Sequence, residues 1–150
     1  MPQATATPPT GTSAVSTGAA SPTAPFATEY DAVLATVEHY VAGGRAGDSS
    51  LMRPHFLEDA TMVGYAGGEL LTGTIQRLYD WIDANGPAPD IEIRYTSVDI
   101  HDTIAVVQLE AERWSGKFAG SDVHMSDAFT LIKTAEGWRM AHKLFHWYAQ

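Results

Sequence analysis

The sequence predicts an α+β fold in which helices come first along the chain and strands follow. Apolar residues recur with the helical period of 3.6 residues over 28–44, and again over 74–85. From Asp90 onward, β-branched and aromatic residues fill several runs that short turns separate. A strongly twisted antiparallel or mixed sheet, covered by the N-terminal helices, curls into a cone whose concave face forms a pocket.

Length and composition exclude several classes of protein. The 150 residues, 45 % of them hydrophobic, predict one domain with a real core. The net charge of −9 argues against binding a nucleic-acid backbone or an anionic membrane. The chain has no cysteine, so disulfides and thiolate chemistry are excluded. We expect no membrane span and no signal peptide, and hence a cytoplasmic protein.

The first part of the chain divides into a tail and a helical region. Residues 1–25 are rich in Pro, Thr, Ala and Ser and predict a disordered tail, which leaves 26–150 as the folded domain. Thr28 is the expected N-cap of the first helix, and Gly43 and Gly44 are expected to end it. Asp48 is expected to cap a short second helix.

The remaining elements are read from turn residues and alternation. Two short strands are expected over 60–65 and 69–72, before a helix that opens at Gly73-Thr74 and ends at Asn85-Gly86-Pro87. Four longer strands follow, over 91–100, 104–114, 121–133 and 138–148.

The last two strands carry the most informative residues. Alternation places Val123, Met125, Asp127, Phe129 and Leu131 on one face of the first strand. It places on one face of the second strand Met140, His142, Leu144, His146 and Tyr148. One mostly apolar surface would thus carry a carboxylate and two imidazoles. Charge on such a surface costs free energy unless it is paired or used, which marks a candidate site.

Several short motifs occur in a familiar order: Val41-Ala-Gly-Gly-Arg-Ala-Gly-Asp48, Phe56-Leu-Glu-Asp-Ala-Thr61, Leu71-Thr-Gly-Thr74, Ser126-Asp-Ala-Phe-Thr-Leu131 and Gly137-Trp-Arg-Met140. Through them the chain resembles the nuclear transport factor two-like superfamily, which includes ketosteroid isomerase, scytalone dehydratase and the SnoaL-like polyketide cyclases. It is most similar to the "putative lumazine-binding" branch. The resemblance covers about residues 26–148 and implies a cystatin-like roll. It names no reaction, because this fold hosts many.

The comparison with ketosteroid isomerase implies roles for individual residues. Tyr40 matches the oxyanion-binding tyrosine, and Asp127 matches the aspartic acid that ketosteroid isomerase keeps protonated in an apolar site. The position of the general-base aspartate falls on Gly64, so that base is missing. His142 and His146 are the expected substitutes. The expected pocket residues are Tyr65, Trp81, Leu109, Met125, Phe129 and Leu144.

The histidines do not suggest a metal site. His142 and His146 lie four residues apart on a strand, about 13 Å along the chain, which is too far for one ion. His124 falls on the face opposite Asp127, where it is exposed or at a dimer interface. We expect neither a metal nor a cofactor.

Three functional hypotheses remain open. The first is a cofactor-independent acid–base enzyme, an isomerase, dehydratase or cyclase of an apolar oxygenated small molecule, with His142 as base balanced by Asp127 and Tyr40 polarising the substrate. The second is a binding module without chemistry, and the third a structural dimer with a filled core. A homodimer is expected through the convex face, where the outward residues would be Ile104, Val106, Phe145 and Trp147.

Overall fold

A computed structural model describes residues 25–114, 116 and 123–148. The expected tail lies outside these ranges apart from Pro25, so the division of the chain into tail and domain stays a prediction. The described elements are, in chain order, α1 (Pro25–Ala46), η2 (Ser49–Leu51), η3 (Arg53–His55), β1 (Phe56–Ala66), β2 (Glu69–Thr74), α2 (Gln76–Asn85), β3 (Glu92–His101), β4 (Ile104–Glu112), β5 (His124–Thr134) and β6 (Gly137–Tyr148). No helix among the described residues is long and apolar enough to cross a membrane.

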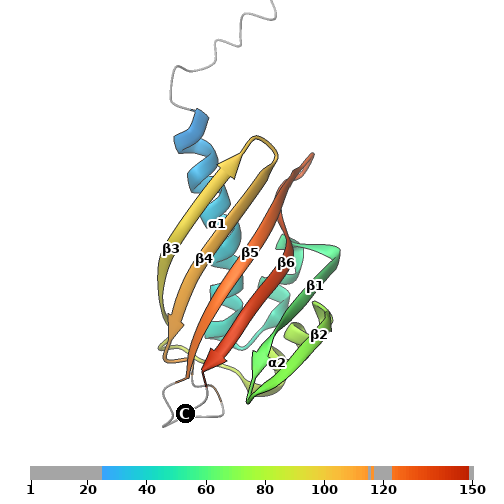
Figure 1. The fold of residues 1–150 in the computed structure, drawn as a ribbon, viewed down its shortest axis with the longest axis vertical. Coiled ribbons are helices and arrows are strands. Elements are labelled where there is room, and N and C mark those ends of the chain that lie inside the picture. The colour runs from blue at the N-terminus through green and yellow to red at the C-terminus, as the bar shows by residue number, and fades with distance from the viewer. Residues whose placement is uncertain (1–24, 115, 117–122, 149–150) are drawn as a thin grey trace, which may run out of the picture.

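The six strands form one curved sheet with the order β2-β1-β6-β5-β4-β3. β1 pairs with β6 in parallel, and every other neighbouring pair is antiparallel. Both α-helices lie on the same face of the sheet, behind it in the view of Figure 1. The predicted α+β class, the mixed sheet and the helices over one face are therefore confirmed.

The C-terminal end of α1 differs from the prediction. The helix continues through Gly43 and Gly44, and Gly47, at φ +66°, ends it. The amide of Gly47 donates to the Gly44 carbonyl at 3.3 Å and that of Asp48 to the Gly43 carbonyl at 3.0 Å, a Schellman arrangement. A Cβ on Gly43 or Gly44 would collide with Met52 or Trp114. These two glycines therefore allow close packing inside the helix rather than ending it.

Most other boundaries follow their predictions closely, apart from those of β1. Asp48 caps η2 by accepting from the Ser50 amide at 2.9 Å. α2 buries its apolar stripe, formed by Leu78, Tyr79 and Ile82, against the sheet side of the domain. β1 is longer than expected because it pairs with β6 as well as with β2.

A β-bulge in β6 decides which residues reach the concave face. Thr130 of β5 pairs with His142, whereas Leu131 pairs with Met140, so Ala141 is an extra residue without a partner on β5. Such a residue reverses the alternation of the strand beyond it. Trp138 and Met140 point to the core before the bulge, and after it the inward residues are Lys143, Phe145 and Trp147.

The outward side chains change with the bulge. Phe145 and Trp147, predicted on the convex face, pack against the core, so that prediction was wrong. Ile104 and Val106 are exposed as predicted, at 53 % and 38 %.

Candidate functional site

A cavity of about 170 Å³ lies between the helices and the concave face of the sheet. Its volume is close to that of a cavity of about 150 Å³ that is known to hold benzene, so it has room for a molecule of about one ring. Its wall is mostly apolar and comes from both helices and from four strands: it comprises Tyr40, Met62, Ala66, Leu71, Thr72, Arg77, Leu78, Trp81, Trp114, Met125, Lys143, Phe145 and Trp147. This open space argues against the hypothesis of a filled structural core.

Three polar side chains meet at the buried wall of this cavity. The Tyr40 hydroxyl on α1 donates to Asp127 Oδ2 on β5 at 2.8 Å. The Lys143 Nζ on β6 lies 3.0 Å from Asp127 Oδ1. All three residues are at most 3 % exposed. Tyr40 and Lys143 line the cavity, whereas Asp127 lies behind them and joins them.

Tyr40 is held as a neutral donor. Burial raises its pKa well above the ordinary value, and the negative charge of Asp127 and its hydrogen bond to that carboxylate raise it further. The ring of Tyr40 packs at 4.9 Å from Phe129 and 5.2 Å from Trp114, measured between ring centroids. The hydroxyl is thereby fixed on the carboxylate. The contact between Tyr40 and Asp127 that the family resemblance implied is present.

Lys143 is the residue that the sequence analysis missed. Its ammonium lies 4.3 Å from the centroid of the Phe145 ring and 5.5 Å from that of Tyr40, within the range of cation–π attraction. A buried ion pair is expensive to desolvate and is kept only with good geometry and further partners. Here the carboxylate has both a hydroxyl and an ammonium as partners, and the ammonium has two aromatic faces.

The position that matched the missing base is closed to a side chain. Gly64 is buried on β1, and a Cβ built there would collide with the backbone oxygen and the ring of Phe145. Phe145 therefore occupies the space that a carboxylate at this position would need. Lys143, two residues earlier on the same strand, is an ionisable side chain that does line the cavity.

The cavity also has polar groups toward the surface. Arg77 on α2 and Thr72 on β2 are exposed residues that line it. The Arg77 Nη1 donates to the Thr72 carbonyl at 2.8 Å, which orients the guanidinium. Arg77 thus provides a solvent-exposed positive charge at the cavity, whereas the other cationic residue in its wall, Lys143, is buried.

The structure places the predicted pocket residues in three groups. Trp81 and Met125 line the cavity, as expected. Leu109 and Phe129 are buried in the core but are not part of the cavity wall. Tyr65 and Leu144 are each 48 % exposed and point away from the concave face, so their predicted placement was wrong.

His142 and His146 also lie on the outward face, contrary to the predicted face. The Nδ1 of His142 lies 2.7 Å from the Thr61 hydroxyl. The ring of His146 lies 4.5 Å from Tyr148 and 6.4 Å from Tyr65, measured between centroids. The bulge at Ala141 is the reason, since it turns even-numbered residues outward beyond that point. Neither histidine lines the cavity.

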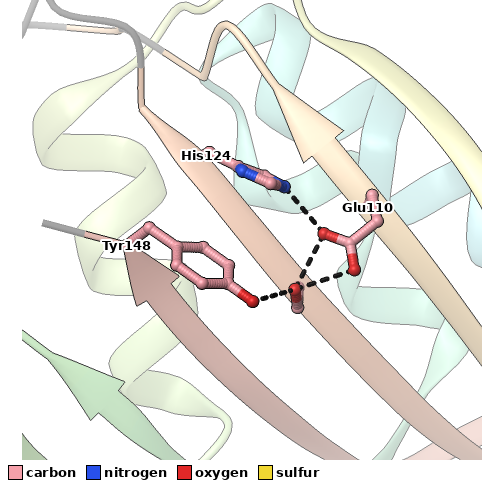
Figure 2. A network of polar contacts seen from close by, with 4 residues as sticks. Glu110, His124 and Tyr148 are labelled. Carbon is pink, nitrogen blue, oxygen red and sulfur yellow. Dashed lines mark hydrogen bonds and ion pairs between the residues drawn. The ribbon is translucent and has the colours of Figure 1, made fainter. Parts of the chain in front are cut away.

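A polar network occupies the outward face near the end of β6 (Figure 2). Ser126 donates to the Glu110 carboxylate at 2.7–2.8 Å and lies 3.0 Å from the Tyr148 hydroxyl. His124 Nε2 lies 2.7 Å from Glu110 Oε2, and its ring stacks on Tyr148. The serine contacts the carboxylate and not the imidazole, so this is no nucleophile–base pair. His124 lies opposite Asp127, as predicted.

No group of three or more His, Asp or Glu side chains with the geometry of a metal site occurs in the described part of the chain. The arrangement at the cavity is one lysine, one carboxylate and one phenol. Such a set can donate and accept protons, and a desolvated lysine can also act as a nucleophile.

Comparison with known proteins places the chain in a family. Residues 28–146 match the family described as "putative lumazine-binding". The chain belongs to this family. It lies within the NTF2-like superfamily, which confirms the resemblance noted from the sequence.

Three similar proteins illustrate the relationship. Aldolase FrzH from Cladobotryum sp. is 29 % identical over 120 residues, which cover 80 % of this chain and 92 % of the relative. An NTF2-like protein of unknown function from Shewanella baltica is 29 % identical, with a TM-score of 0.76, over 85 % of this chain and 99 % of the other. An NTF2-like protein of unknown function from Methylobacillus flagellatus is 33 % identical, with a TM-score of 0.73, over 81 % of this chain and 94 % of the other.

Proposed function

We propose that the protein is a cofactor-independent enzyme that removes and returns protons next to the carbonyl group of a small, mostly apolar molecule. The observation that carries this proposal is Lys143, a buried lysine that lines an apolar cavity and is paired with Asp127 at 3.0 Å. Ionisable groups that are desolvated in a cavity and coupled to a specific partner mark functional sites. Lys143 replaces His142 in the role of the base.

The proton movements balance within the pair. One ammonium proton of Lys143 passes to Asp127, which leaves a neutral amine beside a neutral acid. The amine then takes a proton from the carbon next to the substrate carbonyl and becomes an ammonium again. That ammonium lies next to the enolate and stabilises its charge in a medium of low dielectric constant. Tyr40 keeps Asp127 oriented toward Lys143 throughout.

This step is common to isomerases, dehydratases, cyclases and aldol-forming enzymes. A relative of this chain carries the name aldolase, and aldol addition begins with the same enolisation. The cavity volume of about 170 Å³ favours a substrate, or a reacting part of one, of about one ring.

Deuterium exchange tests the proposal. A panel of enolisable ketones and β-hydroxy carbonyl compounds is incubated in D₂O with the full chain, and NMR follows the loss of the α-proton signal. We expect exchange above background with the wild type, background exchange with Lys143→Met, and wild-type exchange with the control Lys133→Met. Lys133 is a suitable control because it is an exposed lysine that pairs with Glu29, away from the cavity.

Equal exchange in the wild type and in Lys143→Met would refute the assignment. The alternative is a binding module without chemistry, which the closure of the Gly64 position by Phe145 favours. Tight binding of panel compounds, measured by calorimetry, without exchange in any variant would support that alternative.

We also propose that the protein forms a homodimer through the outward face of the sheet. Large apolar side chains are exposed there at 38 % or more, among them Tyr65, Ile104, Val106, Leu144 and Tyr148. An apolar surface of this kind marks an interaction site. Light scattering at micromolar concentration should give the mass of a dimer, and Leu144→Glu should shift it to that of a monomer. A monomeric wild type would contradict this proposal.

A further inference from the structure

Lys143 is placed for covalent chemistry as well as for proton transfer. It is 2 % exposed, yet it lines the cavity, so a molecule held there contacts its side chain away from bulk water. Lys133, in contrast, is exposed and pairs with Glu29. A lysine nucleophile needs a site shielded from bulk water and a neighbour that takes its proton. The cavity wall supplies the first and Asp127 the second.

We propose that Lys143 forms an imine with an aldehyde or ketone substrate, so that the carbon–carbon chemistry of the site runs through an enamine. This inference rests on the proposed function and names its covalent step. It goes further because the lysine nitrogen becomes covalently bonded to the carbonyl carbon, whereas proton transfer alone forms no covalent bond between the substrate and the protein.

The atoms and charges of the step balance. The ammonium gives one proton to Asp127, and the neutral amine adds to the carbonyl carbon. A proton moves from the nitrogen to the oxygen and gives a carbinolamine. Asp127 then returns its proton to the hydroxyl group, which leaves as water. The products are an iminium ion, one water molecule and the Asp127 carboxylate. The released water molecule then relays the α-proton from the cavity to that carboxylate, which gives the neutral enamine and protonated Asp127.

The charges around Lys143 favour these reaction steps. The iminium ion carries its positive charge on the nitrogen that carried the ammonium charge, which lies 3.0 Å from Asp127 Oδ1 in the structure, so Asp127 still has a counter-ion after the reaction. The Phe145 ring, 4.3 Å from the lysine nitrogen, remains over a cation. The buried ion pair is thus replaced rather than broken, and the penalty for an unpaired buried charge is avoided.

Tyr40 and Asp127 then act in different ways. Asp127 exchanges protons with the reacting nitrogen and oxygen and is the acid–base partner. Tyr40 donates to the other carboxylate oxygen and is a positioning residue. Removing the Tyr40 hydroxyl should therefore slow imine formation without changing which lysine reacts.

Reductive trapping tests the proposal. The full chain is incubated with acetone or cyclohexanone and then with sodium borohydride, and mass spectrometry of peptides locates the reduced adduct. We expect the adduct on Lys143 at probe concentrations that leave Lys133 unmodified. Lys143→Met should lose this adduct, Lys133→Met should keep it, and Asp127→Asn should form it about 100-fold more slowly, as expected for loss of an acid–base partner.

A second variant protects the test from a folding defect. Lys143→Met leaves Asp127 buried without its cation, so the double variant Asp127→Asn with Lys143→Met serves as a neutral version of the site. A folded double variant that takes no adduct supports the assignment.

The outcomes separate this inference from the proposed function. Adducts confined to exposed amines, together with α-proton exchange that depends on Lys143, would overturn the imine and leave acid–base catalysis standing. Adducts confined to exposed amines with no exchange at all would overturn both.

Discussion

Replacing Lys143 by methionine should strongly destabilise the fold. Methionine keeps most of the apolar stem but removes the ammonium, so the Asp127 carboxylate stays buried without its cation. Removing one member of a buried pair costs about 3–5 kcal/mol, because an uncompensated charge remains. The lost cation–π contact with Phe145, at 4.3 Å, favours the upper end of that range.

The expected loss is large enough to measure directly. For a domain of this size, about 1 kcal/mol corresponds to about 2–4 °C in Tm, so Lys143→Met should lower Tm by about 6–20 °C. Circular dichroism during thermal and urea unfolding gives both the midpoint and the free energy of unfolding. The control Lys133→Met removes a surface ion pair with Glu29 and should cost at most about 1 kcal/mol.

The double variant decides whether charge is the cause. Asp127→Asn with Lys143→Met removes both charges, and replacing a buried pair by neutral groups is often close to neutral for stability. We therefore expect the double variant to recover most of the stability that Lys143→Met loses. A loss below about 1 kcal/mol in Lys143→Met, or a double variant no more stable than the single one, would refute the reasoning.

Three further predictions concern neighbouring contacts. Tyr40→Phe should lower the free energy of unfolding in urea by about 1.5–3 kcal/mol, because Asp127 Oδ2 loses a donor at 2.8 Å. Gly64→Ala should cost about 1–3 kcal/mol in the same assay and weaken ligand binding, because the new methyl group displaces Phe145 from the cavity wall. Burial, and then the charges of His39 and Arg139, lower the pKa of His55 below 6.5 in the folded state. The unfolded chain therefore binds a proton more readily, so the free energy of unfolding should fall as pH drops below about 6.5. His55→Asn should flatten this dependence of Tm on pH.

Each of these three has a result that would contradict it. Wild-type stability of Tyr40→Phe would mean that the hydroxyl contributes nothing to holding Asp127. Unchanged ligand binding in Gly64→Ala would separate Phe145 from the binding site. A Tm of wild type that is constant between pH of about 7.5 and 5.5 would remove His55 as a source of pH dependence.

The alternation of β5 was predictable because the strand is regular. It pairs with β4 without a break, so the inward position of Asp127 between Met125 and Phe129 follows from counting residues. The helical position of Tyr40 followed in the same way from the apolar period of α1. These two residues come from regular elements, and their contact is present in the structure.

The end of α1 was predicted wrongly because glycine has two uses. A pair of glycines after an apolar stripe is typical of a helix end. In this chain the pair lies under the side chains of Met52 and Trp114, which no local pattern reveals. The residue that does end the helix is Gly47, whose positive φ meets the ordinary requirement of a C-terminal cap.

The proposed base could not be predicted from the sequence, because one extra residue in β6 decides which ionisable side chain of this strand points into the cavity. This strand lies between β5, which runs antiparallel to it, and β1, which runs parallel, and its register with both neighbours shifts between Met140 and His142. Neither the side chain nor the backbone preference of Ala141 indicates a bulge at this position. Without the bulge, His142 would point into the cavity; with it, Lys143 does. A register shift of one residue exchanges the two faces of a strand, and here it also places an amine instead of an imidazole at the cavity wall. Of these two groups only the amine can form an imine with a carbonyl carbon, so the bulge at Ala141 determines which chemistry the cavity can support.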